Sequence, residues 1–355
     1  MPDDIPGDWS RLATFLQISD LHIGEIDPLK GDATVSATAA QFYGTTTWFD
    51  GLLGHHGAAL EALEEFCDRL RTQDEGDFQL IVTGDLTRTG DYMDFFNATR
   101  FLNSSLDLSP PTMLRAAGLG MGSVDLVIPG NHDQWGGSFV AFGGGPSQYG
   151  AYITSPVPRV YPAIPLANGR QVVFIAIDSD ADVWALSHDR QLALGKFASQ
   201  LTHPNALPPH PPDPNDIRMM LIHHSWEQGG KILRMRTQSK NELGKFLVRH
   251  HIKGILTGHS HGPWLDYFTV SPSGVVIAEL RAGTASQLDQ VPANWGSVWG
   301  GSLPTRKWDP NSVLVHRVFD DGAGQTHWHA QVYRRSETTG FQELVRPGSS
   351  LMFQV

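Results

Sequence analysis

The feature that most constrains this chain is one polar turn behind an apolar run. Residues 124–128 are largely apolar and predict a buried strand, and Gly130, Asn131, His132 and Asp133 follow its end. Ligands of α/β proteins are held at the carboxyl ends of strands. An amide, an imidazole and a carboxylate gathered there indicate a metal-binding or proton-transfer site, although a simple polar turn would also explain this tetrapeptide on its own.

Four further predicted strands end in residues of the same kinds. Their ends carry Asp20 and His22, Gly84 and Asp85, His223 and His224, and Gly258, His259 and His261. Side chains at positions i and i+2 of an extended segment point to one side, so each Asp-x-His or His-x-His pair can reach one ion. Each motif is weak alone. Together, in this order, they offer enough nitrogen and oxygen ligands for two metal ions sharing a carboxylate, and no thiolate, which suits Mn, Fe, Zn, Co or Ni.

Composition narrows the class of protein. The 355 residues are 40% hydrophobic and 18% charged, which favours a folded core over disorder. The net charge of −11 disfavours binding of long nucleic acid, which needs Lys and Arg against phosphates. The single cysteine, Cys67, excludes an intrachain disulfide and is expected to be a small buried residue. We find no bilayer-length apolar run and no signal-peptide pattern, and expect a soluble, cytoplasmic protein.

Periodicity predicts the secondary structure. Strands are expected at residues 13–18, 78–82, 124–128, 171–177, 217–222, 253–256, 274–280, 312–319 and 326–333. Helices are expected at residues 55–71, 91–106, 187–201 and 241–250. We expect His55 and His56 on the surface at the start of the first helix, and His327 and His329 on an exposed strand. Strands that alternate with helices, followed by a run of strands, predict a mixed α/β fold.

No repeat or break in composition requires a second domain. We expect a single domain over residues 1–355, with the motifs in 16–262 and a β-rich part in 263–355. Long polar or Gly- and Pro-rich segments lie between the motifs and are expected to set substrate choice, because loops of this length are usually functional. They cover residues 23–54, 134–170 and 284–309.

The motif series resembles the calcineurin-like metallophosphoesterase family, whose members share Asp-x-His, Gly-Asp, Gly-Asn-His-Asp or Glu, His, and Gly-His-x-His. The resemblance spans residues 16–261. It implies an αββα sandwich, in which two mixed β-sheets are flanked by helices and the metal site lies at the carboxyl ends of the strands. It also implies metal-dependent hydrolysis of phosphoesters by two divalent or trivalent ions, expected to be Mn, Fe or Zn.

The resemblance also assigns roles residue by residue. One metal ion would be bound by Asp20, His22 and His261, the other by Asn131, His223 and His259, with Asp85 as the bridge. His223 is preferred to His224 because the first His of such a pair is the ligand in similar sequences. A metal-bridging hydroxide would attack phosphorus while His132 assists the leaving group.

The sequence leaves the roles of three further residues open. Asp133 is included with His132 in the catalytic pair, and it could orient either the His132 ring or the turn. Arg88 and His224 are candidates for substrate contact, although a solvated surface arginine is an equal alternative for Arg88.

Arg88 also separates this chain from two branches of the family. Purple acid phosphatases carry a Tyr at this position, and protein Ser/Thr phosphatases continue with Asp-Arg-Gly where this chain has Arg88, Thr89 and Gly90. The Gly84-Asp85-Leu86-Thr87 turn and the aromatic-rich helix after it look more like bacterial cyclic-nucleotide and glycerophosphodiester phosphodiesterases.

The expected function is therefore phosphodiester hydrolysis on small organic phosphates. A phosphomonoesterase and a nuclease of the same family remain alternatives, and so does a non-catalytic binding scaffold with this fold. The scaffold is disfavoured because no ligand is missing from the motif set. A small phosphoester is the expected partner, no membrane is expected, and the oligomeric state stays open.

Overall fold

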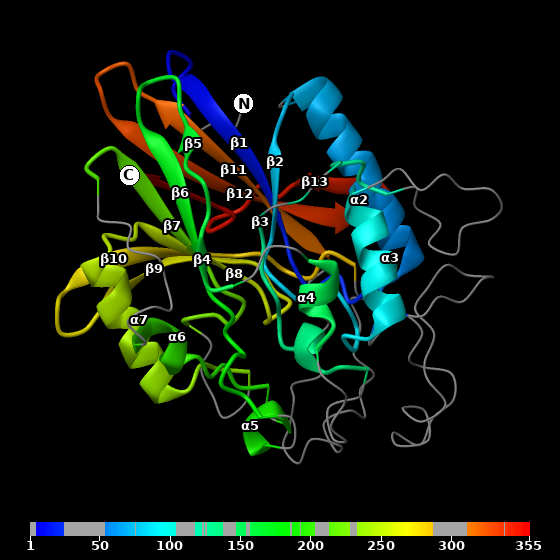
Figure 1. The fold of residues 1–355 in the computed structure, drawn as a ribbon. Helices are drawn as coiled ribbons and strands as arrows, with labels where there is room; N and C mark the ends of the chain where they lie inside the picture. The colour runs from blue at the N-terminus through cyan, green and yellow to red at the C-terminus, as the bar shows by residue number, and fades with distance from the viewer. Residues whose placement is uncertain are drawn as a thin grey trace.

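The computed structural model describes residues 5–24, 54–74, 76–103, 118–122, 124, 126–137, 147–153, 157–184, 187–191, 193–202, 213–227, 233–286, 311–336 and 338–355 (Figure 1). Three long segments are expected to set substrate choice, 23–54, 134–170 and 284–309. Most of the first and the last, and part of the second, therefore lie outside the described residues. Within the described part, two β-sheets pack face to face and helices cover their outer faces.

The first sheet has seven strands in the order β13-β12-β11-β1-β2-β3, with β14 paired to β12. Strands β1, β2 and β3 are parallel, and the C-terminal strands join through the antiparallel pair of β1 and β11. The strands are β1 Ser10–Ile18, β2 Gln79–Val82, β3 Leu126–Val127, β11 Ser312–Asp320, β12 Thr326–Ser336, β13 Gly340–Glu343 and β14 Ser350–Gln354.

The second sheet also has seven strands, in the order β4-β6-β7-β8-β10-β9, with β5 paired to β6. Its central strands β6, β7, β8 and β10 are parallel, so their carboxyl ends meet at one edge. The strands are β4 Arg159–Val160, β5 Ile164–Pro165, β6 Gln171–Ala176, β7 Asp216–Leu221, β8 Gly254–Thr257, β9 Trp264–Val270 and β10 Val275–Arg281.

The helices lie on the two outer faces, α2 and α3 against the first sheet and α6 and α7 against the second (Figure 1). They are α2 Gly57–Arg69, α3 Tyr92–Asn103, α4 Tyr149–Tyr152, α5 His188–Gln191, α6 Ala198–Thr202 and α7 Thr237–Arg249, with a π-helical turn Leu70–Asp74 and a 3-10 turn His132–Gln134. The predicted αββα sandwich of two mixed sheets is confirmed. None of the described helices has both the length and the apolar character needed to cross a membrane.

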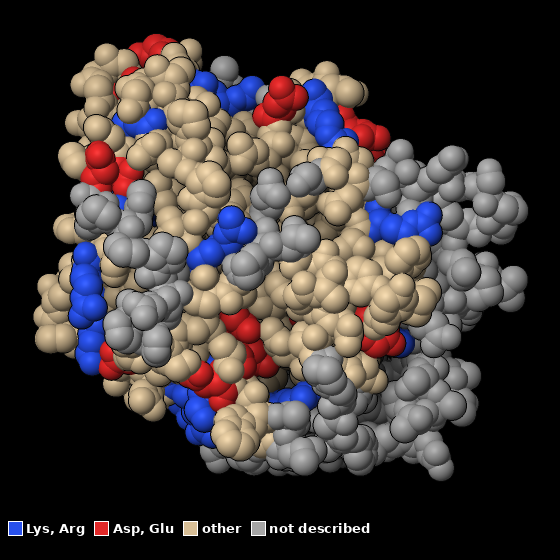
Figure 2. Space-filling view, in the orientation of Figure 1, with Lys and Arg blue, Asp and Glu red and all other residues tan. Residues whose placement is uncertain are grey.

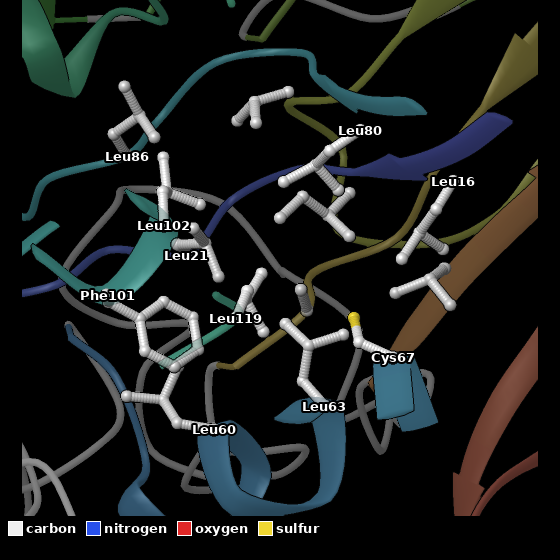
Figure 3. Packing of buried hydrophobic residues seen from close by; sticks show 14 of the residues in the cluster. Leu16, Leu21, Leu60, Leu63, Cys67, Leu80, Leu86, Phe101, Leu102 and Leu119 are labelled. Carbon is white, nitrogen blue, oxygen red and sulfur yellow. The ribbon is translucent and has the colours of Figure 1, made fainter. Parts of the chain in front are cut away.

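Apolar spacing explains why α2 packs where it does. Leu60, Leu63 and Cys67 recur at three- and four-residue steps, so they form one stripe that faces the first sheet. Figure 3 shows this stripe against Leu16 and Leu80 from β1 and β2. Cys67 is buried as expected, and burial raises the pKa of its thiol to about 12.

The predicted helix over residues 187–201 is wrong. Two short helices, α5 and α6, stand there instead. The chain between them runs beside another segment, because Gly195 forms a bridge with Met235 and the Lys196 amide donates to the Ser179 carbonyl at 2.8 Å. These long-range backbone bonds compete with the helix that the local pattern favours.

Two histidine predictions are also wrong. His55 is fully buried rather than on the surface: its amide donates to the His22 carbonyl at 3.0 Å, and its Nδ1 accepts from the Gly24 amide at 3.3 Å. Helix α2 begins only at Gly57. His329 is buried on β12, whereas the neighbouring His327 is partly exposed and stacks on Trp9.

A chain of polar side chains crosses the core between the sheets. Trp328 Nε1 donates to His316 Nδ1 at 3.1 Å, and His316 Nε2 lies 2.9 Å from the Gln17 Oε1 acceptor. The Gln17 amide then donates to Thr83 Oγ1 and to the Thr257 carbonyl. Both His316 nitrogens are thus used by a neutral ring, and burial, with the charges of nearby groups, lowers its pKa to about 3.

We predict that His316 makes the stability of the fold sensitive to acid. A pKa near 3 in the folded state against about 6.5 in the unfolded state gives stability that is present above pH 6.5 and lost as the pH falls. The His316→Gln variant should be less stable at pH 7.5, yet its unfolding free energy should fall less steeply between pH 6 and 4, by roughly 1.4 kcal/mol per pH unit.

Urea unfolding of the two proteins in chelator, at a series of pH values, measures this slope. The exposed His251 provides the matched control as His251→Asn. Equal slopes in wild type and His316→Gln would contradict the prediction.

Candidate metal centre

The parallel strands of both sheets bring the predicted ligands to one place. Asp20 and His22 follow β1, Asp85 follows β2, Asn131 follows β3, His223 follows β7, and His259 and His261 follow β8. Backbone bonds fix these ends to one another. The Asp20 and His22 amides donate to the Gly84 and Asp85 carbonyls at 3.0 and 2.9 Å, and the Gly258 amide donates to the His223 carbonyl at 2.9 Å.

Among the described residues, three groups of side chains have ligand atoms within 4.8 Å of one another. They are Asp20, His22 and His261; His22, Asp85 and His132; and Asp85, His223 and His259. Asp85 belongs to two groups. Its Oδ2 lies 3.2 Å from His223 Nε2 and 3.8 Å from His22 Nε2, while Asp20 Oδ1 lies 3.3 Å from His261 Nε2. The structure thus brings six of the seven predicted ligands together around two carboxylates.

Several ligand atoms at this site fit a bound cation. Asp20 Oδ1, His22 Nε2, Asn131 Oδ1 and His259 Nε2 are buried, and none has a hydrogen-bond partner among the described residues. Buried polar atoms are normally paired, so unpaired ones in one cluster indicate a missing partner. Asn131, the seventh predicted ligand, is 2% exposed and so belongs to this buried set. Carboxylate, imidazole and amide donors are those expected for a transition-metal ion.

Backbone carbonyls orient two of the imidazoles. His223 Nδ1 lies 2.7 Å from the Thr83 carbonyl and His132 Nδ1 lies 2.7 Å from the Arg88 carbonyl, so each Nδ1–H donates outward. The Nε2 atom of each ring is left to face Asp85. Such an outer hydrogen bond fixes the tautomer and direction of a metal-binding histidine.

The charges in the site are strongly coupled. Burial alone would raise the pKa of Asp85, but the His223, His132 and His22 charges hold it well below its usual range. The opposite holds for His223, because burial lowers its pKa and the Asp85 charge raises it to about 10. Burial lowers the pKa of His132 to about 3. The pair of Asp85 and His223 is therefore ionic without a cation, whereas burial lowers the pKa of His132 and of His259 and keeps both rings neutral.

Five of the ligand residues have left-handed backbones. The φ angles are 54° for Asp20, 47° for His22, 51° for Asp85, 70° for His259 and 57° for His261. Residues other than glycine seldom adopt this conformation, and it concentrates at functional sites where neighbouring structure enforces it. These are therefore turns held in one shape for their side chains.

Asp133 supports the turns rather than the His132 ring. Its carboxylate accepts from the amides of Gly130, Leu86 and Thr87 at 2.9, 3.2 and 2.9 Å, and from the Thr87 hydroxyl at 2.7 Å. It is fully buried. Of the two roles that the sequence left open, the contacts support orientation of the turn.

The two candidate substrate contacts are both buried. His224 is fully buried, with Nδ1 2.7 Å from Ser179 Oγ and Nε2 3.2 Å from the Ala193 carbonyl, so both ring nitrogens are used by the protein. The structure thus argues against His224 as a substrate contact. Arg88 is 7% exposed and its charge acts on the buried Asp94, so the solvated-surface alternative is wrong.

Sequence reasoning missed two buried carboxylates beside the site. Asp178 and Asp180 follow β6, and their pKa values are raised by burial, to about 6 for Asp178. Asp178 Oδ2 accepts from Gln134 Nε2 at 2.8 Å, and the charges of both residues interact with His223. Their position after a predicted strand was the available signal, but no motif marked them.

Comparison with known proteins gives one family. A family model described as calcineurin-like phosphoesterase matches residues 13–263, and no curated protein matches the chain.

Solved structures resemble the chain only distantly. One, GAP50, described as the anchor in the inner membrane complex of Plasmodium, is 11% identical with a TM-score of 0.45, over 94% of this chain and 89% of that chain. A predicted phosphoesterase from Streptococcus pneumoniae TIGR4 is 12% identical with a TM-score of 0.31, over 98% and 99%. Vps29 with Zn²⁺ from Entamoeba histolytica is 11% identical with a TM-score of 0.29, over 96% and 98%. No functional conclusion follows from likenesses this distant.

We predict that Gly130→Ala disrupts the centre. A Cβ atom at Gly130 would overlap the carboxylate and the amide of Asp85, so Asp85 or the Gly130 turn must shift. Displacing a shared ligand should weaken Mn²⁺ binding at least about tenfold, as changes around metal ligands typically do. Calorimetric titration of chelator-treated protein measures the affinity.

Gly150→Ala is the matched control, because a Cβ there meets no atom within 4 Å. Wild-type affinity in both variants would show that Asp85 does not depend on the close approach of Gly130.

Proposed function

The chain belongs to the calcineurin-like phosphoesterase family, and from this membership we propose that it is a dinuclear metal-dependent phosphodiesterase acting on small organic phosphates. The family accounts for a metal-dependent phosphoesterase in general. The use of two ions, the diester preference and the role of His132 form the proposal.

The observation that carries the proposal is the sharing of Asp85 and His22 between groups of ligand atoms. Asp85 joins His223 and His259 on one side and His22 and His132 on the other, and His22 links onward to Asp20 and His261. This arrangement suits one ion held by Asp20, His22 and His261 and a second held by Asn131, His223 and His259, with Asp85 between them. Two such ions would neutralise phosphoryl charge and lower the pKa of a water molecule towards neutrality.

The protein itself would supply orientation and a hydrogen-bonding group. His132 Nε2 lies 4.0 Å from Asp85 Oδ2, and its ring is held by the Arg88 carbonyl and by a tilted contact with the Trp135 ring, with ring centroids 3.6 Å apart. A phosphoryl group beside Asp85 would thus present an ester oxygen to His132. Because Nδ1–H donates to the Arg88 carbonyl and burial keeps the ring neutral, Nε2 must first take up a proton, which the negative charge of a bound phosphate would favour. The protonated ring could then donate to the leaving oxygen.

The sequence around Asp85 favours a diester over a monoester. The Gly84-Asp85-Leu86-Thr87 turn and the aromatic-rich helix after it resemble those of bacterial phosphodiesterases.

Surface charge favours a small substrate. Among the described residues on the face in Figure 2, Lys and Arg form separate small groups, and acidic side chains gather beside a hollow in the lower half. Long nucleic acid needs a continuous basic track. With a net charge of −11, this pattern disfavours the nuclease alternative.

We predict metal-dependent hydrolysis with a preference for diesters. With added Mn²⁺, the protein should hydrolyse bis-p-nitrophenyl phosphate with a higher kcat/KM than p-nitrophenyl phosphate, because the turn at Asp85 resembles that of bacterial phosphodiesterases. Chelation should abolish both activities and Mn²⁺ should restore them. Release of p-nitrophenol, followed by absorbance, measures the rates.

The other outcomes discriminate among the alternatives. A preference for the monoester would make the protein a phosphomonoesterase, and cleavage of single-stranded DNA would favour the nuclease. Metal binding with no turnover of any of these substrates would support the non-catalytic scaffold.

We predict that His132→Gln lowers kcat about 10²- to 10⁴-fold, the usual range for loss of a general acid or base. The metal content should stay at the wild-type level, because the variant keeps the proposed ligands. Initial rates and metal analysis on the same preparation measure both. A wild-type kcat in the variant would remove His132 from the mechanism.

A further inference from the structure

A buried carboxylate on the second sheet receives four hydrogen bonds from two ligand-bearing loops. Glu279 lies on β10 and is fully buried. Its Oε1 accepts from Ser225 Oγ at 2.6 Å, the Trp226 amide at 3.0 Å and Thr257 Oγ1 at 3.1 Å, and its Oε2 accepts from the Glu227 amide at 3.0 Å. A carboxylate has about four lone-pair positions, so four donors match its total capacity, although three of them share Oε1.

Arg281 extends this network along β10. It lies two residues after Glu279, and therefore on the same face of the sheet. Its Nη1 donates to Ser225 Oγ at 2.9 Å, and its Nε donates to the Gly262 carbonyl at 2.9 Å. The Ser225 hydroxyl thus accepts from Arg281 and donates to Glu279, which joins the two side chains into one unit.

Three residues in this unit lie within two positions of a proposed ligand. Ser225 is two residues after His223, Thr257 is two before His259, and Gly262 directly follows His261. We propose that Glu279 and Arg281 are positioning residues for the metal centre, which hold the His223 loop and the Gly258–Gly262 turn in the geometry that cation binding requires. The inference rests on the proposed metal function of these histidines.

The turn needs support from outside its own sequence. His259 and His261 have left-handed backbones, with φ angles of 70° and 57°. Such conformations persist only where the surrounding structure enforces them. Bonds to Thr257 at one end of the turn and to Gly262 at the other fix the chain on both sides of the two ligands.

The unit holds the loops through charge as well as shape. Removing the Glu279 carboxylate would leave two amides and two hydroxyls buried without their acceptor, and unpaired buried donors drive local rearrangement. Three of the four donors lie shortly after His223, so the segment that carries this ligand would be the first to shift. Both residues lie beyond residues 13–263, so the family match does not include them.

The test is a calorimetric titration of Mn²⁺ into the chelator-treated full chain. Glu279→Gln keeps the size of the side chain but turns an amide group towards one of the donors. It should weaken Mn²⁺ binding by about 10- to 100-fold, the usual effect of losing an outer partner of a metal ligand. Ser225→Ala removes only the hydroxyl between Glu279 and Arg281 and should give a smaller loss in the same direction.

Asp266→Asn is the matched control. Asp266 lies directly opposite Glu279 on β9, and its side chain is exposed. Its replacement by Asn removes one negative charge, as Glu279→Gln does. The control variant should bind Mn²⁺ like the wild type. Thermal unfolding without metal measures the stability of each variant separately from its Mn²⁺ affinity. Ser225→Ala should bind Mn²⁺ more weakly than the control even if the two variants have the same melting temperature.

Each result decides the matter. Wild-type affinity in Glu279→Gln and Ser225→Ala would overturn the positioning role while leaving the metal centre intact. No Mn²⁺ binding by the wild type would overturn both the proposed function and this inference. If Glu279→Gln does not fold, Ser225→Ala and Asp266→Asn carry the comparison.

Discussion

The left-handed backbone at five ligand residues is the constraint on which the site depends. Each such residue costs about 1–3 kcal/mol relative to an ordinary conformation, so the site is stable only because other contacts oppose that cost. The contacts are specific. The Asp133 carboxylate accepts from the Leu86 amide, directly after Asp85, and from the Gly130 amide of the neighbouring turn, and the His259 amide donates to Asp20 Oδ2 at 2.9 Å. The two sheets bring the strand ends together, and buried carboxylates hold the turns after those strands in the shape that the site needs.

Polar contacts in the core between the sheets also help to position the metal ligands. A sandwich of this kind needs only apolar side chains to hold its sheets together, and most of this layer is apolar. Gln17 departs from that pattern, because its amide reaches Thr83 and Thr257, which stand at the carboxyl ends of β2 and β8. The Thr83 carbonyl in turn orients His223. Polar contacts deep in the core thus fix the relative heights of the two strand ends that carry ligands.

The ligands could be predicted from sequence because each is a local feature. Asp20, Asp85 and His259 follow apolar runs within a few residues, and parallel strands bring such ends together whatever the rest of the chain does. The same locality explains the strands that were found, whereas the αββα architecture was expected from the resemblance to the family. Where an apolar run, a turn and a ligand are adjacent in sequence, the physics that joins them acts over a short range.

The misses share the opposite property. His316 bonds to Gln17 across 299 positions of sequence, and Glu279 bonds to Ser225 across 54. Nothing near His316 or Glu279 indicates these partners. The helix predicted through Gly195 failed for the same reason, since its competitor lies at Met235. Single-sequence patterns reveal what a residue can do, and distant segments decide whether it does so.

The division of the ligands between the two sheets has a mechanical consequence. Asp20, His22 and Asp85 belong to the first sheet, and His223, His259 and His261 belong to the second. A cation held by both sets would link the two sheets, so the sheets could not separate before the ion is released. Resistance to unfolding then rises with the concentration of free metal, since a ligand that binds only the folded state stabilises it by mass action. The cation that equips the protein for chemistry would also fasten its two halves together.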